Sequence, residues 1–276
     1  MTELLTPFAT EIAANKNATQ APGALARIET ATSSLNVRLR GCYITACELT
    51  GLETGARIGV LYSDPNITVP KINASHVMMP VGSSKGIGGG HGFARWADYK
   101  ELPLADGPAG EKQIAIQAKR PDNGLSLTKS FRLTGSALTS LTNVYNPGTT
   151  AERTSLGEHL YFDLAGEQFE GFRINGQTLD ELMGEGAEVA VKNDDTLEWY
   201  DFDGEALVEF PAGHSIRLSA EFTGDTELPL SIGIWHRRGT PSVCVEPIVG
   251  VRDDRNDGIK LIPYTGAGLL TKIELL

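Results

Sequence analysis

One histidine of this chain lies inside an apolar, aromatic-rich run. His159 stands in S-L-G-E-H-L-Y-F-D-L, residues 155–164, directly before Leu160, Tyr161 and Phe162. An imidazole in such surroundings has little water of its own, so it needs either a fixed structural partner or a chemical task. From this segment alone, a core histidine and a general acid or base both account for the pattern.

A carboxylate stands in a second apolar run. Glu246 lies in C-V-E-P, residues 244–247, directly before Pro247, which cannot donate to a β-ladder and is expected to end the pairing of that strand. A glutamate there is either held in an ion pair or lies in a cleft, where burial raises its pKa toward the value that a general base needs. Both alternatives remain open at this point.

A glycine-rich run, G-G-G-H-G-F-A-R, covers residues 88–95. Phosphate-binding loops of the dinucleotide or P-loop type need a strand before the glycines and a helix after them, and neither pattern is present. Glycines also let a backbone turn tightly beside another group. If residues 91–95 are extended, His91, Phe93 and Arg95 share one face and reach a common place. The alternative is a loop whose His91 and Arg95 meet solvent or a carboxylate.

An acidic, aromatic segment, D-D-T-L-E-W-Y-D-F-D, covers residues 194–203. Aromatic rings pack on the apolar faces of sugars, and carboxylates accept hydrogen bonds from hydroxyls, so this composition suits sugar binding. A strand end with solvated charges is the alternative for each of its residues. No spacing typical of a metal site occurs in the chain.

The elements that must position these residues are mostly strands. Apolar and polar residues alternate over 35–40, 113–119, 215–221 and 230–234, as in strands with one face on a core. Turn sequences such as Asn-Gly, Asp-Gly and Asn-Pro-Gly separate these runs. Strands do not alternate with long amphipathic helices, which argues against an α/β fold.

These patterns predict an all-β protein built as one large antiparallel β-sandwich. We expect a single domain over residues 21–276. Residues 1–20 are expected to form a short N-terminal helical extension, because their apolar residues lie near helical spacing.

The bulk composition excludes some partners. With 24 Lys and Arg against 35 Asp and Glu, the formal net charge of −11 repels nucleic acid and anionic membrane surfaces. No segment approaches the roughly 18 continuous apolar residues of a membrane helix. Three cysteines without C-x-x-C spacing indicate reduced, buried thiols. We therefore expect a soluble, cytoplasmic protein, a monomer or homodimer, with neither nucleic acid nor a membrane as its partner.

Taken together and in this order, the motifs resemble those of the aldose 1-epimerase (galactose mutarotase-like) superfamily, nearest its glucose-6-phosphate 1-epimerase-like branch. The resemblance covers roughly residues 25–276 and is carried by H-G-F-A-R at 91–95, H-L-Y-F at 159–162, V-E-P at 245–247, Asn146-Pro147-Gly148 and Ile234-Trp235. It implies a large antiparallel β-supersandwich, a sugar substrate, and no metal or organic cofactor.

The resemblance also implies a role for each motif residue. His159 would be the general acid and Glu246 the general base of a reaction that opens and recloses a sugar ring at C1. His91 would bind the substrate, with Arg95 lining the site. The implied activity is interconversion of the α and β anomers of a hexose or hexose phosphate.

Two further points concern the substrate. The resemblance implies an acidic residue that binds sugar hydroxyls, for which Asp201 is the first candidate and Glu198 the second. Residues 75–85, S-H-V-M-M-P-V-G-S-S-K, lack the arginine that phosphosugar-acting relatives tend to carry there, so Lys85 and Arg95 are the nearby cations.

Two rival functions are compatible with the same fold. One is a catalytically silent sugar-binding protein. The other is a hydrolase or lyase on a similar sandwich, which needs two cleft carboxylates or a tyrosine base such as Tyr161.

Overall fold

The computed structural model describes residues 24–65, 73–81, 91–104, 107–108, 110–164, 171–178, 181, 195–224, 227–237, 239–251 and 258–276, except for the side chains of 195–200 and 237. The expected helical extension at residues 1–20 lies outside these ranges.

Nearly every described element is a strand. In chain order the elements are β1 (Leu25–Glu29), β2 (Ser34–Arg38), β3 (Tyr43–Thr50), β4 (Arg57–Gly59), β5 (His76–Met78), the 3-10 helix η1 (Ala94–Trp96), β6 (Lys100–Leu102), β7 (Lys112–Lys119), β8 (Ser126–Leu133), β9 (Ala137–Tyr145), β10 (Glu152–Thr154), β11 (Leu156–Asp163), β12 (Arg173–Ile174), β13 (Asp195–Phe202), β14 (Glu205–Glu209), β15 (Ser215–Thr223), β16 (Leu230–Arg237), β17 (Ser242–Val249), β18 (Ile259–Leu261) and β19 (Gly266–Leu275). No helix in this part of the chain has the length and apolar character needed to cross a membrane.

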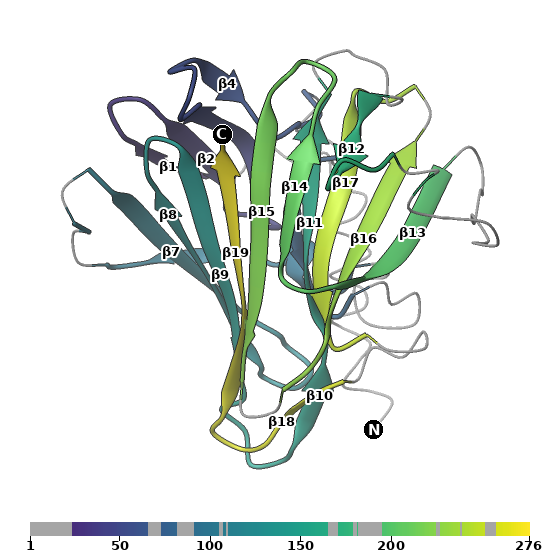
Figure 1. Ribbon diagram of the computed structural model, residues 1–276. Coiled ribbons are helices and arrows are strands. Elements are labelled where there is room, and N and C mark those ends of the chain that lie inside the picture. The colour runs from purple at the N-terminus through teal and green to yellow at the C-terminus, as the bar shows by residue number, and fades with distance from the viewer. Residues whose placement is uncertain are drawn as a thin grey trace.

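The strands form two large antiparallel sheets and two small ones (Figure 1). The larger sheet has the order β12-β14-β15-β19-β9-β8-β7-β6, and the second has the order β13-β16-β17-β11-β5. A four-stranded sheet, β1-β2-β3-β4, and the pair β10-β18 complete the fold. The predicted all-β antiparallel sandwich is confirmed, and the alternating runs of the sequence became β2, β7, β15 and β16.

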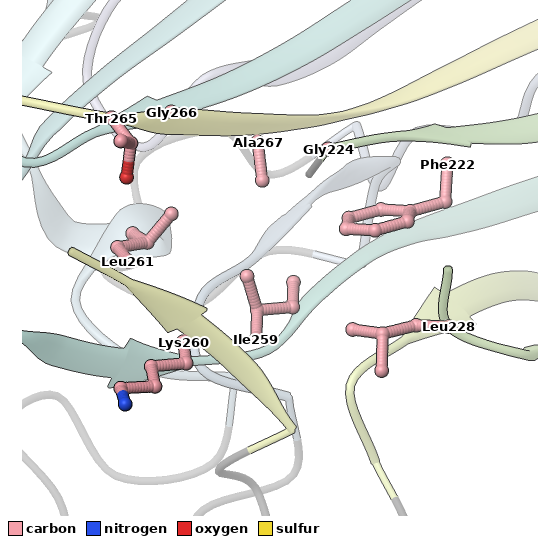
Figure 2. Close-up of a pocket in the computed structure, with 9 residues that line it drawn as sticks. All are labelled: Phe222, Gly224, Leu228, Ile259, Lys260, Leu261, Thr265, Gly266 and Ala267. Carbon is pink, nitrogen blue, oxygen red and sulfur yellow. The ribbon is translucent and has the colours of Figure 1, made fainter. Parts of the chain in front are cut away.

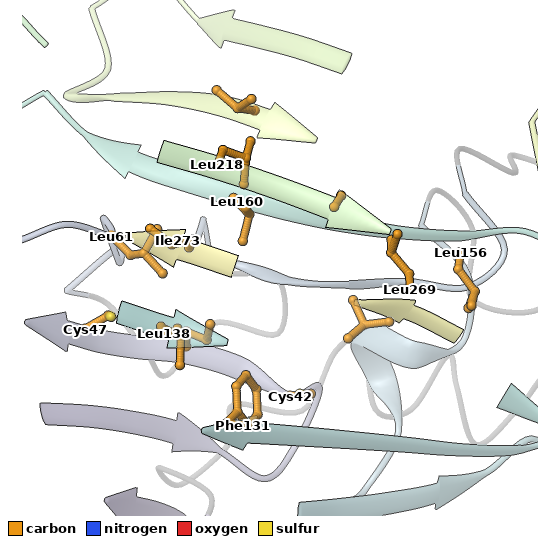
Figure 3. Packing of buried hydrophobic residues seen from close by; sticks show 14 of the residues in the cluster. Cys42, Cys47, Leu61, Phe131, Leu138, Leu156, Leu160, Leu218, Leu269 and Ile273 are labelled. Atoms are coloured by element: carbon orange, nitrogen blue, oxygen red, sulfur yellow. The ribbon is translucent and has the colours of Figure 1, made fainter. Parts of the chain in front are cut away.

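The inner faces of the sheets share one apolar core. Leu156 and Leu160 of β11 lie in the same buried cluster as Leu218 of β15 and Leu269 and Ile273 of β19 (Figure 3). The three cysteines are free and buried, as the sequence predicted. Every residue of β17 and all but the last of β11 are buried, so the centre of the five-stranded sheet is covered on both faces.

A buried ion pair joins the two large sheets behind β11. The Lys129 ammonium of β8 donates to Glu158 Oε1 of β11, and it also donates to Ser140 Oγ at 3.1 Å and Thr142 Oγ1 at 2.9 Å. The Thr142 hydroxyl donates in turn to Glu158. Lys129 is 1% and Glu158 3% exposed, so both charges depend on this network for solvation.

Removing one partner of this pair should destabilise the fold. We expect Glu158→Gln to lower the free energy of unfolding by about 3 kcal/mol, because it leaves the Lys129 charge buried without a countercharge. The double variant Lys129→Met with Glu158→Leu should recover most of that loss, since it removes both charges and keeps the volume. Urea denaturation followed by circular dichroism measures all three proteins. A double variant no more stable than the single one would contradict this account.

Candidate active site

Strand pairing places the two predicted catalytic residues side by side. On one side of β11, His159 pairs directly with His76 of β5. Along its other edge β11 pairs with β17. The residue pairs before and after this position put His159 opposite Glu246. Directly opposed residues of antiparallel strands point to the same face, with Cβ atoms about 4.5–5.5 Å apart. One row across three neighbouring strands therefore carries His76, His159 and Glu246.

His159 and Glu246 form a buried acid–base pair. His159 Nε2 lies 3.1 Å from Glu246 Oε1, and the two residues are 4% and 3% exposed. Burial raises the pKa of Glu246 to about 8, because the carboxylate has lost its water. At this separation the imidazole and the carboxyl group are in direct contact, so a change of charge on one acts on the other.

The expected end of the strand at Pro247 is wrong. β17 continues to Val249, and Pro247 pairs with Ile232 of β16. Proline lacks the N–H group, and the ladder between β11 and β17 is interrupted at residues 246–247 but continues on both sides. Glu246 is thus held in a paired strand, next to a proline whose backbone cannot donate a hydrogen bond.

Aromatic rings enclose the His159 imidazole. Tyr161 stacks on it with centroids 4.6 Å apart and planes at 12°, and His76 stacks at 4.8 Å and 22°. The Trp235 ring meets it edge-on at 6.3 Å. Burial raises the pKa of Tyr161 well above its ordinary value, so the phenol stays neutral and is a poor base.

His91 reaches the same place from a loop. Its ring lies 4.8 Å from that of His159 at 81°, in an edge-on contact. Met79 N donates to His91 O at 3.2 Å, and Phe93 N donates to Met79 O at 3.1 Å, so the loop runs against the end of β5. A Cβ on Gly92 would lie 1.9 Å from Met79 O, and only glycine permits this approach.

The segment that carries His91 and Arg95 is not extended. His91 and Gly92 both have φ of +68°, and η1 begins two residues later. A positive φ at a non-glycine residue is strained and is concentrated at functional sites. The tight turn beside another group that the glycines suggested is therefore present, whereas the extended conformation considered for residues 91–95 is not.

Arg95 is buried next to Tyr43, which contacts one of the histidines. It is 3% exposed, and its Nε donates to Tyr43 Oη at 3.3 Å. The Tyr43 ring lies 5.3 Å from that of His76. Arg95 is therefore joined to the cluster by Tyr43, and its charge also acts on His76. Its role in lining a substrate site stays a prediction.

The structure does not bring Asp201 to the pair. Asp201 is exposed on β13, which lies two strands further from β11 than β17 does. It pairs with Ser231 of β16, two residues along the strand from Gly233, which pairs with Glu246. Glu198 pairs with Ile234, and its side chain lies outside the description. Sugar binding by either carboxylate stays a prediction.

His76 is the site residue that the sequence analysis missed. It stands in the short apolar run S-H-V-M-M-P, where β5 has only three residues. The signal is the same as for His159, an imidazole among apolar neighbours, but the run is too short to stand out as a strand.

One group of described residues has the chemistry of a metal site. Ligand atoms of His159, Cys244 and Glu246 lie within 4.8 Å of one another. Burial raises the pKa of the Cys244 thiol well above its ordinary value, which disfavours the thiolate that a metal needs. His159 and Glu246 already bind each other, so proton transfer is the simpler chemistry of this group.

A separate small cavity lies outside the row of His76, His159 and Glu246. It is lined by Phe222, Leu228, Ile259 and Leu261 among others (Figure 2). Its volume of about 20 Å³ holds one water molecule. It is too small for a sugar, and none of the predicted site residues lines it.

Comparison with known proteins identifies the architecture. No protein-family model and no curated protein matches the sequence. Among solved structures, the Slr1438 protein of Synechocystis sp. PCC 6803 is 17% identical, with a TM-score of 0.72 over 94% of this chain and 98% of that one. A galactose mutarotase related enzyme of Lactobacillus acidophilus is 16% identical, with a TM-score of 0.67 over 92% and 97%. A galactose mutarotase-like protein of Lactobacillus casei ATCC 334 is 16% identical, with a TM-score of 0.66 over 92% and 100%.

The chain has the galactose mutarotase-like fold. This confirms the fold that the resemblance implied. At such low identity the likeness establishes the fold, and the chemistry has to be argued from side chains, because one fold hosts many functions. In this galactose mutarotase-like sandwich the His159–Glu246 pair lies at the centre of the five-stranded sheet.

The burial of Glu246 should reduce stability as pH rises. A carboxyl group whose pKa is raised from about 4.3 when unfolded to about 8 when folded binds its proton more tightly in the native state. Its unfavourable contribution therefore grows between those two values. We expect Glu246→Gln to be more stable than wild type by on the order of 2 kcal/mol at pH 8, with little difference near pH 4.

Urea denaturation at several pH values tests this expectation. The exposed Glu101→Gln variant is the matched control and should track wild type throughout. A difference between Glu246→Gln and wild type that does not change with pH would show that Glu246 titrates normally.

Proposed function

We propose that this protein is an aldose 1-epimerase that interconverts the α and β anomers of a hexose or hexose phosphate. The observation that supports this most is the buried 3.1 Å contact between His159 Nε2 and Glu246 Oε1. The ring oxygen and the hydroxyl oxygen at C1 of an aldose share one carbon. An acid and a base that lie side by side can therefore each serve one of them.

The proposed reaction moves one proton in each direction. Glu246 takes the proton of the C1 hydroxyl while protonated His159 gives a proton to the ring oxygen. The bond between C1 and the ring oxygen breaks, and the C1 carbonyl forms. After rotation about the C1–C2 bond, the C5 hydroxyl attacks the other face of the carbonyl, His159 takes back its proton, and Glu246 returns the other.

The site gives less support to the hydrolase or lyase. Glycoside hydrolysis needs a second carboxylate across the scissile bond, and among the described residues Glu246 is the carboxylate in contact with His159. Glu158, the neighbour of His159 in sequence, points to the other face and pairs with Lys129. A tyrosine base is disfavoured because burial raises the pKa of Tyr161.

Loss of either member of the pair should abolish most of the activity. We expect His159→Asn and Glu246→Gln each to lower kcat about 100-fold or more, since general acid–base catalysis contributes about 10²- to 10⁴-fold. Polarimetry of freshly dissolved α-glucose and α-galactose, free and 6-phosphorylated, measures the rates. Glu101→Gln serves as the surface control. Equal rates for wild type and both pair variants would end the mutarotase proposal, and sugar binding without acceleration would favour the silent sugar-binding protein.

The pH dependence should report the shared proton. The working pair holds one proton, so kcat/KM should fall when the pair gains a second proton and when it loses the last one. Because burial raises the pKa of Glu246 to about 8, we expect the alkaline limb at about pH 8 or above. A profile that stays flat from about pH 5 to pH 10 would contradict the assignment.

A further inference from the structure

His76 carries a buried nitrogen that has no partner among the described residues. The residue is 2% exposed, and its Nε2 makes no hydrogen bond to any described residue. Its ring stacks on that of His159 at 4.8 Å and meets the edge of His91 at 5.4 Å. Native proteins satisfy nearly all buried polar atoms, so an orphan atom beside a reactive pair needs an explanation.

The other nitrogen of His76 fixes the hydrogen on the ring. Nδ1 lies 2.8 Å from the carbonyl oxygen of Ala74. A carbonyl oxygen only accepts, so Nδ1 must carry the hydrogen. In the neutral imidazole, Nε2 then has a lone pair and no hydrogen, and it can only accept.

The surroundings keep this imidazole neutral. Burial lowers the pKa of His76 well below its ordinary value, and the charges of Arg95, His159 and His91 lower it further. The carbonyl of Ala74 acts in the opposite direction and is the weakest of these influences. A charged His76 would also oppose the protonated form of His159, which the proposed reaction needs.

We propose that His76 is a substrate-binding residue whose Nε2 accepts a hydrogen bond from a hydroxyl group of the sugar. This inference rests on the proposed function. It names the chemistry of the contact, which is a neutral hydroxyl donor next to the reacting carbon. The lone pair of Nε2 repels a phosphate or carboxylate oxygen, so this part of the site takes a polyol face of the substrate.

Two variants of His76 separate the roles of its nitrogens. Asparagine places an amide near Nδ1, where it can donate to Ala74, but it offers nothing at the position of Nε2. Glutamine places an amide oxygen near Nε2, where it can still accept. We expect His76→Asn to raise KM for the aldose about tenfold with a smaller change in kcat, the effect of losing one hydrogen bond of uniform binding. His76→Gln should recover most of the affinity.

Monodeoxy aldoses identify the hydroxyl. For the sugar that lacks the bound hydroxyl, kcat/KM of wild type should be about tenfold lower than for the parent aldose. The kcat/KM of His76→Asn should be the same for both sugars, because this variant has already lost the contact. Thermal unfolding of both variants shows whether they remain folded at the assay temperature.

The possible outcomes discriminate clearly. An unchanged KM in a folded His76→Asn, a fall in kcat alone, or an equal penalty for every deoxy sugar would overturn the inference, and the last result would leave water as the partner of Nε2. In each of these cases wild type still accelerates mutarotation and the proposed function stands. A wild type without activity overturns both.

Discussion

Strand β11 is buried on both faces, and this constraint organises the molecule. Successive residues of a strand point to opposite sides, so Glu158 faces the core and His159 faces the site. Neither ionisable group can be left unpaired in such surroundings. Lys129 of the opposite sheet forms an ion pair with Glu158, and Glu246 of the next strand contacts His159. A register slip of one residue would exchange the two faces, so these pairs also fix how β11 is placed.

Desolvation limits the proton chemistry of the site to one pair. Tyr161 and Cys244 both lie beside His159 and Glu246, and burial raises the pKa of each well above its ordinary value. Burial lowers the pKa of His76, so this imidazole also stays neutral. Desolvation therefore keeps Tyr161, Cys244 and His76 in their neutral forms. His159 and Glu246, which are in contact, remain as the groups that can exchange a proton.

Sequence predicted the sandwich because strands leave a short-range pattern, whereas the roles of His159 and Glu246 were implied by the resemblance to a family. Alternation with a period of two predicted β7 and β15, and an ionisable residue in an apolar run singled out His159 and Glu246 as candidates. The glycines predicted a tight turn beside another group, but the extended conformation considered for residues 91–95 was wrong, because glycine is compatible with both extended and turned backbones. His76 and the Lys129–Glu158 pair were missed because their significance depends on which strands become neighbours, and single-sequence patterns do not carry that information.

The order β5-β11-β17 also has a consequence for how the protein folds. These neighbours in the sheet come from widely separated parts of the chain, and so do His76, His159 and Glu246. Closing such long loops costs chain entropy before any contact compensates for it, which slows folding and makes these pairings late events. Local hairpins such as β7-β8 and β14-β15 can form early, whereas the site is assembled only when distant segments meet. Chemical competence should therefore be among the last properties that a refolding chain regains.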